Sequence, residues 1–143
     1  MADTLTVAGR SARMSLVRSR GNRATELRLM ALMHEHRITG WRRGVGLLGK
    51  PDFVFRARKV AVFVDGCFWH GCPRHGRTPK TRIAFWTAKF ARNAQRDRIV
   101  TRTLRRSGWR VVRVWECGLS CKRAIRTMAR IAGALSRNPR RAH

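Results

Sequence analysis

Acidic residues are scarce in this sequence. Only 7 of its 143 residues are Asp or Glu, against 33 Lys plus Arg, so the formal net charge is +26. The chain also lacks the apolar run of roughly 20 residues that a membrane span needs, and residues 1–17 lack the apolar core of a signal peptide. We therefore expect no membrane partner and a location in the cytoplasm, where disulfides are rare.

Apolar side chains are plentiful enough for a folded domain. Hydrophobic residues make up 43% of the chain, with 6 Phe and 5 Trp, which argues against a disordered basic tail. Residues 1–50, 51–120 and 121–143 carry net charges of +7, +12 and +7, so the excess is spread over the whole chain. Such a surface attracts a polyanion through counterion release, and nucleic acid is the expected partner.

The composition predicts one domain with two basic ends. Residues 1–21 are rich in Ser, Arg and Gly without periodicity and form a basic N-terminal arm, expected to be mobile when alone. The domain covers residues 22–136, and residues 137–143 form a basic C-terminal tail.

Periodicity and turn residues predict an α/β fold with a sheet flanked by helices. Leu27 and Ile125 are assigned to the apolar faces of the first and last helices, and Thr81 to the cap of the central helix. The predicted elements are a helix over 23–36, strands over 53–55 and 60–64 joined as a hairpin, a long helix from about 81 to 108, a strand over 109–115, and a helix from about 122.

Two of the few carboxylates lie at strand ends. Asp52 opens the first strand of the hairpin and Asp65 closes the second, so the hairpin could bring both to one cleft. Oxygen ligands beside a phosphate suit Mg²⁺. The alternative is that both are ordinary turn and strand-end residues.

The cysteines are grouped with a histidine. Cys67, Cys72 and His75 lie within nine residues, and Cys117 follows the later strand; four such ligands suit a tetrahedral Zn²⁺ site. Buried thiols are the alternative, because cysteine is common in cores. Cys121 is left out of the set.

Aromatic residues stand between these ligands. Phe68 and Trp69 are either a small core or a wedge that stacks between bases. His70 is a structural histidine, a fourth zinc ligand or a general base, and its position in the sequence does not rank these roles.

Several motifs, taken together and in order, resemble those of the very-short-patch repair (Vsr) endonucleases over about residues 10–120. They are 49–55 (GKPDFVF), 62–73 (VFVDGCFWHGCP), Phe85-Trp86, Asn93, 96–98 (RDR), 108–111 (GWRV) and 114–117 (VWEC). The resemblance implies a bacterial DNA mismatch endonuclease, active at the nucleoid, with a fold similar to type II restriction endonucleases and a central mixed β-sheet. Members of that family nick one strand 5′ to the T of a T:G mismatch left by deamination of 5-methylcytosine, which starts very-short-patch repair.

The resemblance also assigns catalytic roles. Asp52 would bind catalytic Mg²⁺ together with the backbone carbonyl of Val64, and His70 would be the base for the attacking water. Glu26 would assist the hydrated metal ions, and Asp97 would orient His70.

Further roles follow from the same resemblance for DNA and zinc binding. Phe68, Trp69 and Trp86 would intercalate beside the mismatch, and Met14 would belong to an arm that grips DNA. The structural Zn²⁺ would be held by Cys67, Cys72, His75 and Cys117. The implied partners are a T:G-mismatched duplex and a recruiting repair protein, with the enzyme acting as a monomer.

Two departures from the family pattern leave an alternative open. Asp65 stands where the best-characterised type has a histidine, so it is either an extra metal ligand or a replacement for that histidine. The usual nuclease signature, a carboxylate followed two residues later by Lys, is absent because Cys67 occupies the Lys position. The second hypothesis is therefore a catalytically inactive, zinc-stabilised DNA-binding protein on the same scaffold. A basic RNA-binding or ribosome-associated protein is a third reading that only the charge supports.

Overall fold

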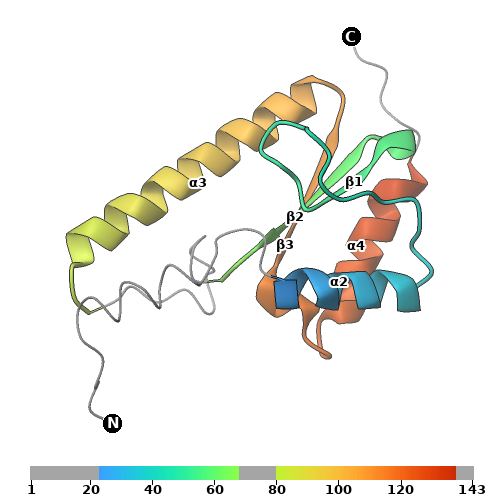
Figure 1. The fold of residues 1–143 in the computed structure, drawn as a ribbon, viewed down its shortest axis with the longest axis horizontal. Helices are drawn as coiled ribbons and strands as arrows, with labels where there is room; N and C mark the ends of the chain where they lie inside the picture. The colour runs from blue at the N-terminus through green and yellow to red at the C-terminus, as the bar shows by residue number, and fades with distance from the viewer. Residues whose placement is uncertain (1–22, 68–79, 138–143) are drawn as a thin grey trace.

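The computed structural model describes residues 23–67 and 80–137, which form a three-stranded sheet with helices on both faces (Figure 1). No helix among these residues has the length and apolar character needed to cross a bilayer. The elements in chain order are α2 (Arg23–Glu35), β1 (Phe53–Phe55), η1 (Arg56–Arg58), β2 (Val60–Asp65), α3 (Ile83–Arg106), β3 (Arg110–Trp115), η2 (Glu116–Leu119) and α4 (Ala124–Ser136).

The sheet is mixed, as predicted. Its order is β1-β2-β3, with β1 antiparallel to β2 and β2 parallel to β3. The short 3₁₀ turn η1 closes the expected hairpin. Parallel neighbours need a long crossover, and α3 lies within the connection from β2 to β3. This crossover brings the ends of β2 and β3 to one edge, where Asp65 is paired with Trp115.

The alternation of β2 side chains divides the core into two parts. Val60, Val62 and Val64 pack with α2 and α4, while Ala61 and Phe63 pack with α3. Successive strand side chains point to opposite faces, and both faces of this strand are buried. A continuous apolar run thus supports two helical layers.

The predicted apolar faces of the two outer helices are confirmed for Met30, Met128 and Leu135, which pack into or against the core, and are wrong for Leu27 and Ile125. Leu27 is 46% exposed and Ile125 is 74% exposed. The buried faces use Leu29 with Met33 and Met128 with Ile131, at the spacings of three and four residues that place side chains on one helix face. Each helix offers apolar residues on more than one face, so periodicity alone could not choose which one packs.

The central helix differs from its prediction at the start. Its N-cap is Arg82, with a left-handed backbone (φ 55°) and no side-chain cap hydrogen bond, so the expected cap at Thr81 is wrong. The first ten residues of α3 include no buried side chain, whereas Asn93, Asp97, Val100 and Leu104 are buried. Figure 1 accordingly shows the yellow-green beginning of α3 extending away from the sheet.

Candidate active site

Asp52 is held at the open end of the β1–β2 hairpin. Its Oδ2 accepts a hydrogen bond of 2.7 Å from the backbone N–H of Val64, and its own N–H donates to the Val62 carbonyl at 3.0 Å. The N–H and C=O of one strand residue point to the same side of the strand, so the Val64 carbonyl lies on the Asp52 side as well. Two oxygen groups from neighbouring strands therefore face one region, which suits a hard cation.

Gly49 allows the chain to enter β1 where it does. Its φ is +77°, and a Cβ there would lie 2.4 Å from Cγ1 of Val100. A left-handed backbone in close contact with another element is a position for glycine. This close approach to α3 fixes the position of the loop, and so the positions of Pro51 and Asp52 at the start of β1.

Glu26 is anchored beside the same hairpin. It lies on the inner side of α2 with 7% exposure and forms an ion pair with the guanidinium of Arg43. That guanidinium also lies 5.7 Å from the ring centre of Phe53, the residue after Asp52. A buried carboxylate is tolerated only with a partner, and Arg43 supplies it between α2 and β1.

Asp65 faces α3, on the other side of β2 from Val64. It is 6% exposed, and its Oδ1 and Oδ2 accept hydrogen bonds of 3.0 and 3.3 Å from Nη1 of Arg113 on β3. The hairpin therefore places the Asp52 carboxylate against Val64, the residue before Asp65. The Asp65 carboxylate itself accepts hydrogen bonds from Arg113 on the α3 side of the sheet.

Asp97 meets the same arginine from α3. Nη1 of Arg113 lies 3.8 Å from Asp97 Oδ1, and Nη2 donates to the Asp97 carbonyl at 3.3 Å. Arg113 Nε donates to Thr101 Oγ1 at 2.9 Å, and its guanidinium lies 4.2 Å from the Phe63 ring centre. One guanidinium thus joins two buried carboxylates from two elements.

The sequence reasoning missed Arg113. A signal was available: after Arg110 at the first position of the strand RVVRVW, Arg113 interrupts a run that is otherwise apolar. In that strand Arg113 is two residues from Val111 and shares its face, which packs against α3. A charged residue at an inward position predicts a buried partner, although the sequence does not say which one.

Cys67 and Cys117 leave neighbouring strands at corresponding points. Each lies two residues beyond the paired residues Asp65 and Trp115. Cys67 is buried, Cys117 is half-buried, and Nη1 of Arg123 lies 3.8 Å from the Cys117 Sγ. Two thiol groups at one sheet edge fit half of a zinc site. In the described part of the chain, no three His, Cys, Asp or Glu side chains form a metal-binding group.

Aromatic residues cluster at the projecting beginning of α3. The Trp86 ring lies 5.3 Å from the Phe85 ring and 5.9 Å from the Phe90 ring, centre to centre. Cationic groups face these rings: Arg82 lies 4.3 Å from the centre of Phe85, and Lys89 lies 5.7 Å from that of Trp86. Phe85 is 40% exposed. The cluster combines flat apolar surface with positive charge.

Comparison with known proteins identifies the family. A family model described as "DNA mismatch endonuclease Vsr" matches residues 2–75, slightly more than half of the chain. The chain belongs to the Vsr family.

Named relatives agree with this assignment. The Vsr-family chain is 50% identical over 113 residues to "Type II nicking enzyme V.NaeI" of Lentzea aerocolonigenes, covering 76% of this chain and 68% of that protein. It is 40% identical over 124 residues to "Type II nicking enzyme V.XorIIP" of Xanthomonas oryzae, covering 84% and 88%. It is 37% identical over 123 residues to "DNA mismatch endonuclease Vsr" of Escherichia coli, covering 83% and 76%.

Some residues that the Vsr resemblance singles out lie outside the described residues. They include the expected base, the arm residue, two zinc ligands and two intercalating aromatics: His70, Met14, Cys72, His75, Phe68 and Trp69. Their roles stay predictions. The described site residues form five groups: Asp52 with Val64, Glu26 with Arg43, Asp65 and Asp97 with Arg113, Cys67 with Cys117 at the strand ends, and the aromatic cluster around Trp86.

Proposed function

We propose that this Vsr-family chain is a Mg²⁺-dependent DNA endonuclease that nicks one strand 5′ to the T of a T:G mismatch and so starts very-short-patch repair. The observation that carries the proposal is the Asp52 carboxylate, held 2.7 Å from the Val64 amide in a chain of this family. The relatives named as nicking enzymes and as a mismatch endonuclease support the same reaction class.

Asp52 and the Val64 carbonyl are the groups that would hold Mg²⁺. Once bound, the ion would supply Lewis-acid neutralisation of the charge that builds up on the scissile phosphodiester. The chain's part is to present the oxygens in a fixed direction. The Val64 N–H does this for Asp52, and Arg43 does it for Glu26, which we assign to the water around the metal.

Proton transfer in the proposed reaction is assigned to His70. It would take a proton from the attacking water, and Asp97 would position it from α3. Asp97 is 9% exposed and lies near the ends of β2 and β3, where it contacts Arg113. A buried carboxylate is a suitable group to orient an imidazole.

Mismatch selection is assigned to the aromatic residues. Trp86, with Phe68 and Trp69, would enter the base stack, and the cost of unstacking is lowest at a mispaired step. The Arg82 and Lys89 side chains beside the rings suit contact with the flanking phosphates. A restriction-endonuclease-like core acting as a monomer fits this proposal, because nicking one strand requires no two-fold symmetry.

Asp52→Asn tests the proposal. Asparagine keeps an oxygen for the Val64 N–H but removes the charge, so the fold should persist while about 4 kcal/mol of transition-state stabilisation, or about a thousandfold in rate, is lost. The measurement is single-turnover nicking of strand-labelled T:G duplexes in varied flanking contexts, with Mg²⁺ or EDTA. Matched T:A and C:G duplexes are the substrate controls.

Binding and unfolding measurements complete this test. We expect Asp52→Asn to bind duplex and to melt like the parent chain. Unchanged nicking by the variant would refute the assignment of Asp52, and a parallel loss of binding and melting temperature would make it a folding residue.

The second candidate is an inactive, zinc-stabilised DNA-binding protein. The observation that favours it is Asp65, which replaces the histidine of the best-characterised family type and is engaged by Arg113. Salt-sensitive binding by the parent chain, with no Mg²⁺-dependent cleavage in any flanking context, would support this candidate over the nuclease.

A further inference from the structure

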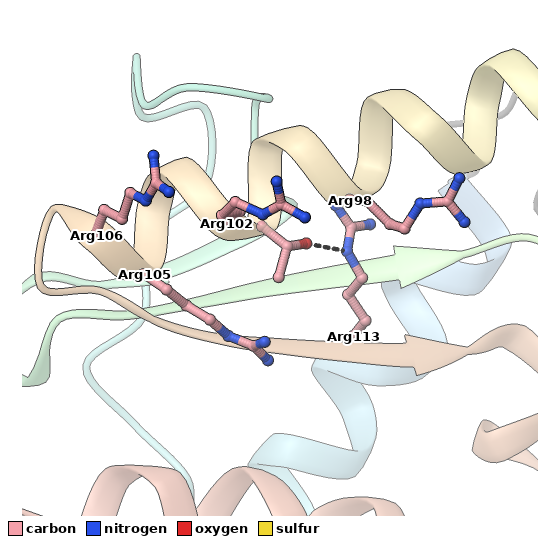
Figure 2. A pocket seen from close by; sticks show the side chains of 6 residues that line it. Arg98, Arg102, Arg105, Arg106 and Arg113 are labelled. Atoms are coloured by element: carbon pink, nitrogen blue, oxygen red, sulfur yellow. Dashed lines mark hydrogen bonds between the residues drawn. The ribbon is translucent and has the colours of Figure 1, made fainter.

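An arginine-lined groove runs along the second half of α3 beside β3. It has a volume of about 600 Å³, and among the described residues that line it, five of six are arginines (Figure 2). We call it the arginine groove; its residues are Arg98, Thr101, Arg102, Arg105, Arg106 and Arg113. It does not include the Asp52 region or the aromatic cluster around Trp86.

The charge in this groove is largely uncompensated. Arg113 is paired with Asp65. It also donates a hydrogen bond to Thr101, drawn as the dashed line in Figure 2. Within residues 23–67 and 80–137, no carboxylate pairs with the other four arginines, and all four are exposed. Like charges gathered in one groove raise its free energy unless an anion is bound there.

The spacing of the groove suits a chain of phosphates. Arg98, Arg102 and Arg105 follow one another at four and three residues, which places them along one helix face. From 98 to 106 the helix rises about 12 Å, and one DNA strand carries a phosphate about every 3.4 Å of its axis. Guanidinium groups also bind phosphate oxygens in a two-pronged geometry that lysine cannot offer.

The groove extends away from the proposed nicking site. Arg113 lies at its Asp65 end, while Arg105 and Arg106 are in the last turn of α3, before the chain enters β3. We propose that the arginine groove is a second nucleic-acid site, which binds backbone phosphates of a duplex segment other than the nicked step. The proposal goes beyond the endonuclease assignment, since neither Asp52 nor the aromatic cluster requires it.

The test is the salt dependence of binding to a matched duplex without metal. The variant carries Arg102→Gln, Arg105→Gln and Arg106→Gln together. Each lost phosphate contact lowers the slope of log K against log salt by about 0.9, so we expect the magnitude of the slope to fall by about 2 to 3. The Arg→Lys version of the same triple should keep most of the slope, because it retains the charge.

A matched control separates the groove from general charge. The triple Arg56→Gln, Arg58→Gln and Arg126→Gln removes the same charge from exposed sites on η1 and α4. We expect its slope to change by less than about 1. An equal change in both triples, or an unchanged slope in the groove triple with an unchanged melting temperature, would overturn the proposal.

Duplex length distinguishes the source of the phosphates. If the groove binds a flank of the same duplex, the groove triple should differ from the parent on a matched duplex several turns long and not on a matched duplex too short to reach beyond the nicking site. If it binds a separate duplex, the difference should appear on both lengths and two duplexes should bind per chain. Because the assay uses matched DNA without metal, its result is independent of whether the chain nicks.

Discussion

At the scale of single residues, Arg113 compensates two buried carboxylates at once. It contacts Asp65 at 3.0 Å and Asp97 at 3.8 Å. Removing one partner of a buried pair leaves the other charge without compensation, so we predict that Arg113→Met lowers the free energy of unfolding by about 3 kcal/mol. Adding Asp65→Asn should recover about 1 kcal/mol of this loss. Urea unfolding of the two single variants and the double variant measures the coupling.

The control for this residue is Arg102→Met. Arg102 is exposed on the same helix side as the groove and has no carboxylate partner among the described residues, so its replacement should change stability by less than about 0.5 kcal/mol. If Asp65 is a metal ligand instead, Asp65→Asn should abolish nicking at unchanged stability, and Arg113→Met should leave the free energy of unfolding unchanged.

At the scale of elements, the first half of α3 differs from the second, because none of its first ten residues is buried. Trp86 lies in a half-exposed aromatic cluster with no buried neighbour in the first ten residues of the helix. We predict that Trp86→Ala reduces T:G nicking about tenfold to a hundredfold through lost stacking, at a stability cost of about 1 kcal/mol or less. Single-turnover nicking and thermal unfolding of the same preparation test this.

The matching control is Ile125→Ala on α4. Ile125 is 74% exposed and lies on the opposite side of the sheet from α3. The Ile125→Ala variant should keep the nicking rate and the melting temperature of the parent chain. Equal losses of activity and melting temperature in Trp86→Ala would instead assign the cluster to the core.

The ends of β2 and β3 carry the zinc prediction. Cys67 and Cys117 lie at equivalent positions beyond the paired residues, and a tetrahedral site predicts about one zinc per chain by elemental analysis. Cys117→Ser should lose the zinc and melt at lower temperature, because a structural metal contributes directly to folding. Cys121→Ser, at an exposed cysteine, should keep it. A folded parent chain without zinc would refute the site.

At the scale of the whole molecule, the net charge of +26 dominates encounters with DNA. We predict that affinity for matched duplex falls about a thousandfold or more between about 50 and 200 mM salt, as for six or more phosphate contacts. Discrimination between T:G and T:A duplexes should improve over the same range, because base contacts and unstacking are screened less than phosphate contacts. Binding that does not respond to salt would contradict this.

Local patterns predicted most of the elements because each one depends on neighbours in the chain. The hairpin, the long helix and the last strand match their predicted ranges closely. Both faces of β2 are buried, as its continuous apolar run suits a central strand. The errors are long-range in origin. Leu27 and Ile125 are exposed because other residues of their helices pack against the sheet. The N-cap of α3 is Arg82 and not Thr81.

Composition and periodicity were enough to predict a basic folded domain of α/β class, and the motifs pointed to the Vsr family. Those properties are readable because composition, periodicity and motif order do not depend on contacts between distant segments. Three arrangements became visible only in the folded chain: Asp52 meets Val64, Arg113 joins Asp65 to Asp97, and four exposed arginines line one groove. Each of these depends on the parallel register of β2 and β3 and on the path of α3, which arise only when the layers pack.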